Sequence, residues 1–82
     1  MENFAREMTG IAERYNQALT LKSKRELATE VDKLHSEMIP IFKTVTAENG
    51  YSVTLCNLAM ELLLDIRMGR PTTTGERLVN FI

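Results

Sequence analysis

Apolar residues recur at alternating steps of four and three along much of the chain, and this spacing constrains the fold more than any other feature. It keeps side chains on one face of an α-helix, where they can be buried together. We therefore predict helices over about residues 3–19 and 24–39, which suit an antiparallel hairpin. The two apolar stripes are Phe4, Met8, Ile11, Tyr15 and Ala18, followed by Leu27, Val31, Leu34, Met38 and Ile41.

The second of these helices has a defined start and an ambiguous end. Ser23-Lys24-Arg25-Glu26 is a capping box, in which serine and glutamate side chains satisfy free N–H groups at a helix start. Pro40 disfavours helix at the residue before it, so we predict that the helix ends or kinks there. The alternative for residues 41–55 is a β-hairpin turning near Asn49-Gly50. We favour the kinked helix, because a lone hairpin is only marginally stable in water.

A third helix is predicted over residues 53–68, and it is more apolar than the other two. Between Leu55 and Ile66, nine of twelve residues are apolar, so nearly every side of this helix has to be covered. Glycine is common just after the last residue of a helix, so Gly69 is predicted to end this one. Thr73-Thr74-Gly75-Glu76 resembles a second capping box, and a short helix is predicted to follow it.

These elements predict an all-α fold, a small bundle of three main helices plus a short C-terminal helix, in one domain over residues 1–82. A chain of 82 residues has a thin stability margin, so association into a homodimer or higher oligomer is expected to help it. Ten Lys and Arg residues against eleven Asp and Glu residues leave a formal charge of −1. This balance argues against nucleic acid as a partner.

The cysteine content and the absence of targeting patterns indicate a compartment. A single cysteine, Cys56, excludes an intramolecular disulfide and favours a reducing environment. The first residues lack the basic and then apolar pattern of a secretory signal. No stretch approaches the roughly 20 apolar residues that a transmembrane helix needs. We therefore expect a cytoplasmic protein without a transmembrane segment.

No residue pattern indicates a catalytic site or a metal site, so we expect neither an enzyme nor a cofactor. His35, the only histidine, has no cysteine or histidine three or four positions away, as a zinc site on a helix would require. Glu61 and Asp65 lie one helical turn apart on a solvent-facing stripe. If that stripe is buried instead, a nearby arginine has to neutralise the carboxylates.

The segment after the third helix holds the best candidate for a small-ligand site. Arg70, Thr73, Thr74 and Arg77 would form an anion-binding pocket at the start of the last helix. The segment lacks the glycine spacing of a phosphate-binding loop. This site supports the alternative hypothesis for function, a binder of a small anionic ligand or nucleotide.

Excess apolar surface on the third helix and on the C-terminal tail is the strongest functional indication. Two neighbouring helices are too few to cover so apolar a helix, and exposed apolar area usually marks an interface. The residues predicted to contact a partner protein or a second copy are Met60, Leu63, Leu64, Arg67, Leu78, Phe81 and Ile82. The alternative is that the tail folds back as a lid over the core.

In size and in the lack of a recognisable site, the chain is similar in type to the small cytoplasmic regulators that phages and plasmids encode. Antiholins and inhibitors of host defence are examples. This likeness covers no residue pattern and identifies no family. It implies a non-enzymatic module that self-associates and that binds and regulates a partner protein.

Overall fold

The computed structural model describes residues 2–47 and 53–82, and their regular structure is entirely helical. The all-α fold class is therefore confirmed, with no strand in either described range. The elements are α1 (Glu2–Leu21), α2 (Lys24–Ala47), α3 (Val53–Met68), α4 (Thr74–Leu78) and the 3₁₀ helix η1 (Val79–Phe81).

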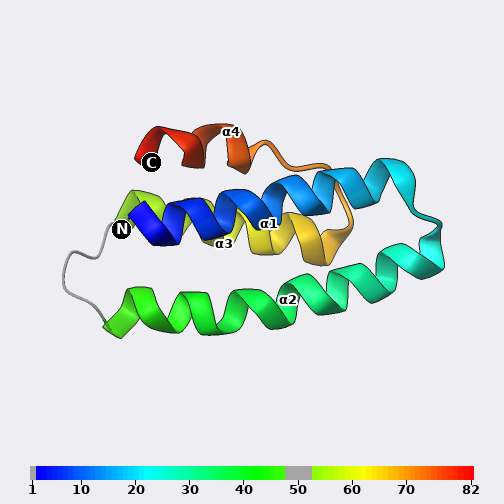
Figure 1. The fold of residues 1–82 in the computed structure, drawn as a ribbon, viewed down its shortest axis with the longest axis horizontal. Coiled ribbons are helices and arrows are strands. Elements are labelled where there is room, and N and C mark those ends of the chain that lie inside the picture. The colour runs from blue at the N-terminus through cyan, green and yellow to red at the C-terminus, as the bar shows by residue number, and fades with distance from the viewer. Residues whose placement is uncertain (1, 48–52) are drawn as a thin grey trace.

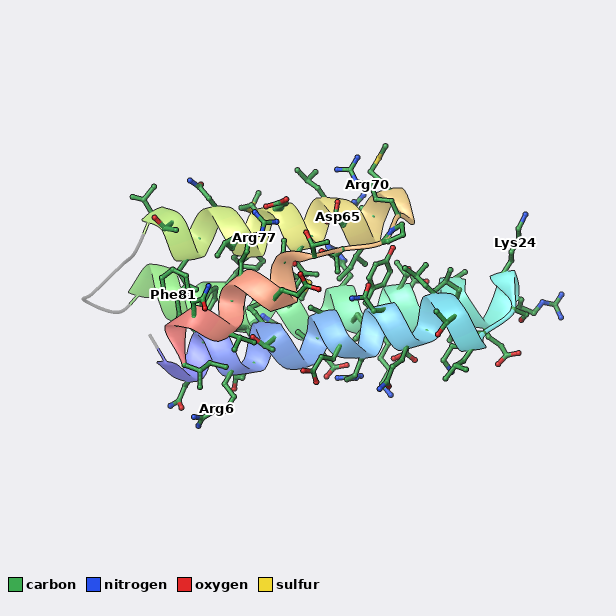
Figure 2. The ribbon with its side chains drawn as sticks, turned by 90° about the horizontal axis from the view of Figure 1, so that it is seen from above. Arg6, Lys24, Asp65, Arg70, Arg77 and Phe81 are labelled. Atoms are coloured by element: carbon green, nitrogen blue, oxygen red, sulfur yellow. The ribbon has the colours of Figure 1, made fainter. Side chains whose placement is uncertain are left out.

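The helices form three layers (Figure 1). α1 and α3 lie side by side and run in the same direction, while α2 runs antiparallel to both along one side of the pair. Figure 2 shows α4 on the opposite side, lying over the line between α1 and α3. One side of α3 thus meets α1, two others meet α2 and α4, and the fourth points away from the bundle.

Local sequence signals set most of the helix ends. The serine half of the Ser23 capping box is formed, because the Glu26 N–H donates to Ser23 Oγ at 3.3 Å. The Glu26 carboxylate accepts from the Ser23 hydroxyl at 3.1 Å. Gly69 ends α3 in the left-handed region, at φ 71°, as glycine readily does. The second capping box is not formed, because the side chain of Thr73 makes no capping hydrogen bond at the start of α4.

Of the two outcomes predicted at Pro40, an end of the helix is wrong, and the continuation as helix that we favoured over a hairpin is confirmed for residues 41–47. α2 continues to Ala47, and α3 begins at Val53, so the hairpin is also wrong for the described parts of 41–55. Residues 48–52 lie outside the described residues. The side chains beyond the proline explain the continuation, because Ile41 and Phe42 pack against the core. The Phe42 ring meets that of Phe4 edge to face at 6.2 Å, which helps to offset the cost of a proline inside a helix.

One closely packed core joins all four α-helices. Gly10 lies inside α1, where glycine would permit a close helix crossing, yet no other helix comes within 4 Å of the position that a Cβ would take there. The close approach is at Gly75 instead, where an added Cβ would lie 3.2 Å from that of Ala12. The core residues are Phe4, Ala5, Met8, Ile11, Ala12, Tyr15, Leu34, Met38, Leu55, Leu58, Ala59, Leu62, Ile66 and Leu78.

Candidate interaction surface

α3 has an inner face that is buried as its apolar pattern demands. Its buried apolar residues belong to the core and face α1, α2 and α4. Leu62, at the middle of this face, is completely buried. The buried apolar residues of α3 are Leu55, Leu58, Ala59, Leu62 and Ile66.

The opposite face of α3 is exposed and mostly apolar, with the polar Asn57 lying between Val53 and Met60. Four side chains at steps of seven, four and four residues share this side of the helix. The exposed fractions of these four residues, the α3 outer stripe, are 60 % for Val53, 48 % for Met60, 52 % for Leu64 and 69 % for Met68. An apolar stripe that the bundle leaves uncovered is the feature that marks contact surfaces.

The predicted interface residues on α3 are distributed around this stripe. Met60 and Leu64 lie in it, Arg67 is exposed beside it, and Leu63 is half-buried and packs against the core. Sequence reasoning missed Val53 and Met68. Their positions, seven residues before Met60 and four after Leu64, were the signal that could have included them.

Charged side chains border the stripe on both flanks. On the flank next to α4, the Arg77 guanidinium donates to the Glu61 carboxylate at 2.7 Å. Figure 2 shows Arg77 reaching from α4 toward α3. On the flank next to α2, Arg67 shares a shallow depression with Asp32 and His35. Each flank therefore carries both a cationic and an anionic side chain.

The C-terminal tail divides between core and surface. Leu78 is completely buried and belongs to the core. Phe81 and Ile82 are 36 % and 48 % exposed, so the bundle covers only part of each. Phe81 lies at the end of the molecule farthest from Arg70 (Figure 2). α4 thus acts as the lid, and the residues after it remain partly accessible.

The loop between α3 and α4 is held by polar contacts that α1 supplies. The Tyr15 hydroxyl lies 2.8 Å from the main-chain carbonyl oxygen of Arg70 and 3.1 Å from that of Asp65. Its single hydrogen is shared between these two oxygens. Asn16 donates to the Thr72 carbonyl oxygen at 3.1 Å. Burial raises the pKa of the Tyr15 hydroxyl, and the nearby Asp65 carboxylate raises it further. This loop is therefore a fixed structural junction.

The residues of the predicted anion pocket are engaged within the chain. Arg70 Nε lies 2.5 Å from Asp65 Oδ1, which is the neutralisation that a buried carboxylate requires, and Arg77 is paired across to α3. Thr74 is completely buried and shares a hydroxyl hydrogen bond with Thr72 at 2.8 Å. Thr73 is exposed, and its side chain makes no capping hydrogen bond. A phosphate group would have to displace two carboxylates to bind both arginines.

The chain also carries one thiol and a group of basic residues near the start of α2. Cys56 is a half-buried free thiol, and the basic residues Lys22, Lys24 and Arg25 are exposed where α2 begins. Among residues 2–47 and 53–82, no group of three or more His, Cys, Asp or Glu side chains is placed to hold a metal ion. Within the same residues, no helix is both long enough and apolar enough to cross a membrane.

Comparisons with known proteins add no relative. No protein-family model matches the chain, and no curated protein or solved structure matches it either. No site or activity is transferred from another protein.

Proposed function

We propose that this protein is a non-enzymatic interaction module that binds and regulates a partner protein through the α3 outer stripe. The observation that carries the proposal is the apolar side of α3 that faces away from the bundle. Met60 and Leu64 are about half exposed at its centre, one helical turn apart. Apolar side chains at this spacing serve as anchors when one helix binds against another surface.

The energetics favour a contact that forms and breaks readily. Covering the exposed half of a leucine or methionine side chain stabilises a complex by about 1 kcal/mol. Four such side chains therefore contribute only a few kcal/mol before the cost of association. Tight binding would need further contacts from the flanks, where Arg67 and the Glu61–Arg77 pair can supply directional bonds. A regulator that has to release its partner fits this range.

We also propose that the protein acts in the cytoplasm, in a regulatory role of the type that phages and plasmids encode. The free thiol of Cys56 suits a reducing compartment. An antiholin or an inhibitor of host defence would act by covering a surface of its target. The α3 outer stripe is the surface of this chain best suited to do so.

Site-specific photo-crosslinking in the source cell tests the proposal. Benzoylphenylalanine in place of Leu64 puts the reactive group at the centre of the stripe, and the same residue in place of Gln17 puts it on the exposed side of α1. We expect an adduct between the chain and a different protein from position 64 and none from position 17. Mass spectrometry of the adduct identifies the partner.

Two outcomes would contradict the proposal. Position 64 would give no adduct with a different protein, or positions 64 and 17 would give the same adducts in equal amounts. The first result would show that the α3 outer stripe has no protein partner. The second would show that any exposed position collides with the same abundant proteins.

A further inference from the structure

We infer that the α3 outer stripe also binds a second copy of this chain, with the two α3 helices antiparallel about a two-fold axis. This inference rests on the proposed function, because it assigns a partner to the same surface. In a two-fold contact the same patch is used twice, so each residue must suit the residue that the symmetry places opposite it.

The central pair of the stripe satisfies this condition. With the axis passing midway between Met60 and Leu64, each Met60 faces the second copy's Leu64, and the two central contacts are both apolar. Val53 and Met68 extend the apolar area toward either end of the helix. A stripe with its largest side chains at one end would leave them facing solvent in this arrangement.

The flanking charges suit the antiparallel orientation. An antiparallel two-fold pairing brings the α4 flank of one copy next to the α4 flank of the other. The two Glu61–Arg77 pairs then meet near the axis, because Glu61 lies next to the midpoint of the stripe. Each Arg77 faces a carboxylate of the second copy as well as its own. A flank of one sign would repel its own copy.

The available area makes this dimer weak and reversible. Four half-exposed side chains and their flanks offer on the order of 400 to 600 Å² per copy, against about 800 Å² in a standard interface. A formal charge of −1 per chain adds little repulsion. The copies should therefore associate at high concentration and separate on dilution, which leaves the stripe free for a different partner.

Sedimentation of the purified full chain over a concentration series tests the self-association. We expect the mass to rise from 9.3 kDa toward twice that value, and Leu64→Glu to remain at 9.3 kDa throughout. Gln17→Glu adds the same charge to the exposed side of α1 and should associate like the wild type. If Leu64→Glu loses helical circular dichroism, Met60→Gln takes its place. A wild-type chain that stays at 9.3 kDa at about millimolar concentration would overturn the inference.

Disulfide trapping tests the orientation in the same purified protein. In a Cys56→Ser background, we expect Met60→Cys mixed with Leu64→Cys to form the mixed disulfide under diamide at least several-fold faster than either variant alone. Faster pairing of each variant with itself would overturn the antiparallel arrangement. The crosslinking in cells reads a different protein, so the proposed function and this inference can fail separately.

Discussion

The outer faces of α1 and α3 differ in chemistry although the two helices lie side by side in the same layer. On α1, the outward positions include Arg6, Glu13 and Gln17, which are exposed and polar. Figure 2 shows Arg6 pointing away from the bundle. On α3, the outward positions include Met60 and Leu64, which are exposed and apolar. Two helices in the same layer can therefore differ in whether their outer face is suited to binding another protein.

The difference separates what folds the chain from what remains for a partner. A polar outer face satisfies its groups with water and needs no cover. An apolar outer face gains nothing from folding, because its exposed area stays in contact with water in both states. Changes on the inner side of α3 should therefore affect stability, and changes on its outer side should affect association.

The largest expected effect on stability comes from placing a charge on the inner side of α3. The same charge on the outer side is the matched control. Leu62→Glu buries a carboxylate in the core, at a cost comparable with the whole stability of a small domain, so the variant should be unfolded. Leu64→Glu should fold, with a melting temperature within a few degrees of the wild type. Thermal melts followed by circular dichroism distinguish the two. If both variants unfold, the outer side is structural and the comparison with α1 fails.

The C-terminal segment offers a second comparison between buried and accessible residues. Leu78→Ala removes a completely buried side chain and should lower the free energy of unfolding by about 3 kcal/mol. Deleting Phe81 and Ile82 together should lower it by about 1 to 2 kcal/mol, because the bundle covers only part of each. Urea denaturation measures both values. A larger loss from the deletion than from Leu78→Ala would assign the lid to the tail instead of α4.

The buried hydroxyl of Tyr15, which joins the inner side of α1 to the end of α3, should give a moderate and pH-dependent effect. Tyr15→Phe removes the hydrogen bond shared by two carbonyl oxygens and should cost about 1 to 2 kcal/mol at neutral pH. Because the folded state raises the pKa of this hydroxyl above 10.0, its contribution is present below about pH 10 and is lost as the pH rises further. Urea denaturation at several alkaline pH values should show a smaller decline for Tyr15→Phe. Equal declines would place the titrating group elsewhere.

The smallest effect on stability is expected from breaking the exposed ion pair between α1 and α2. Arg14 donates two hydrogen bonds of 2.8 Å to Glu37 of α2, and this pairing lowers the pKa of the Glu37 carboxyl. Both side chains are about 40 % exposed, so solvent screens the pair and Arg14→Ala should cost less than about 1 kcal/mol. Urea denaturation near neutral pH and again near pH 3 should show the difference shrinking in acid. A cost of several kcal/mol would make this border a structural element.

Periodicity and capping signals were enough to predict the helices, because each depends on residues close in the sequence. The stripes beginning at Phe4 and Leu27 and the capping box at Ser23 are cases of this kind. The end of α2 could not be predicted. The tendency of Pro40 to break a helix is offset by a contact between Phe42 and Phe4, which lies 38 positions earlier in the chain. The close approach at Gly75 also depends on a distant residue, Ala12.

The candidate surface was predictable in kind and only partly in its members. An excess of apolar residues on α3 indicated an uncovered side, and Met60 and Leu64 lie on it. The sequence could not reveal that Leu78 is buried while Phe81 is partly exposed, since that depends on the angle at which α4 crosses α1 and α3. The pairing of Arg77 with Glu61 likewise required the placement of α4.

Methyl NMR of the methionines tests most directly whether the outer side of α3 is a contact surface. The chain has five methionines, of which Met8 and Met38 are completely buried, while Met60 and Met68 lie in the α3 outer stripe. On concentration from about 20 µM to about 1 mM, we expect the Met60 and Met68 signals to shift and those of Met8 and Met38 to stay fixed. Unchanged Met60 and Met68 signals over this range, or equal shifts of all four, would contradict self-association through the α3 outer stripe.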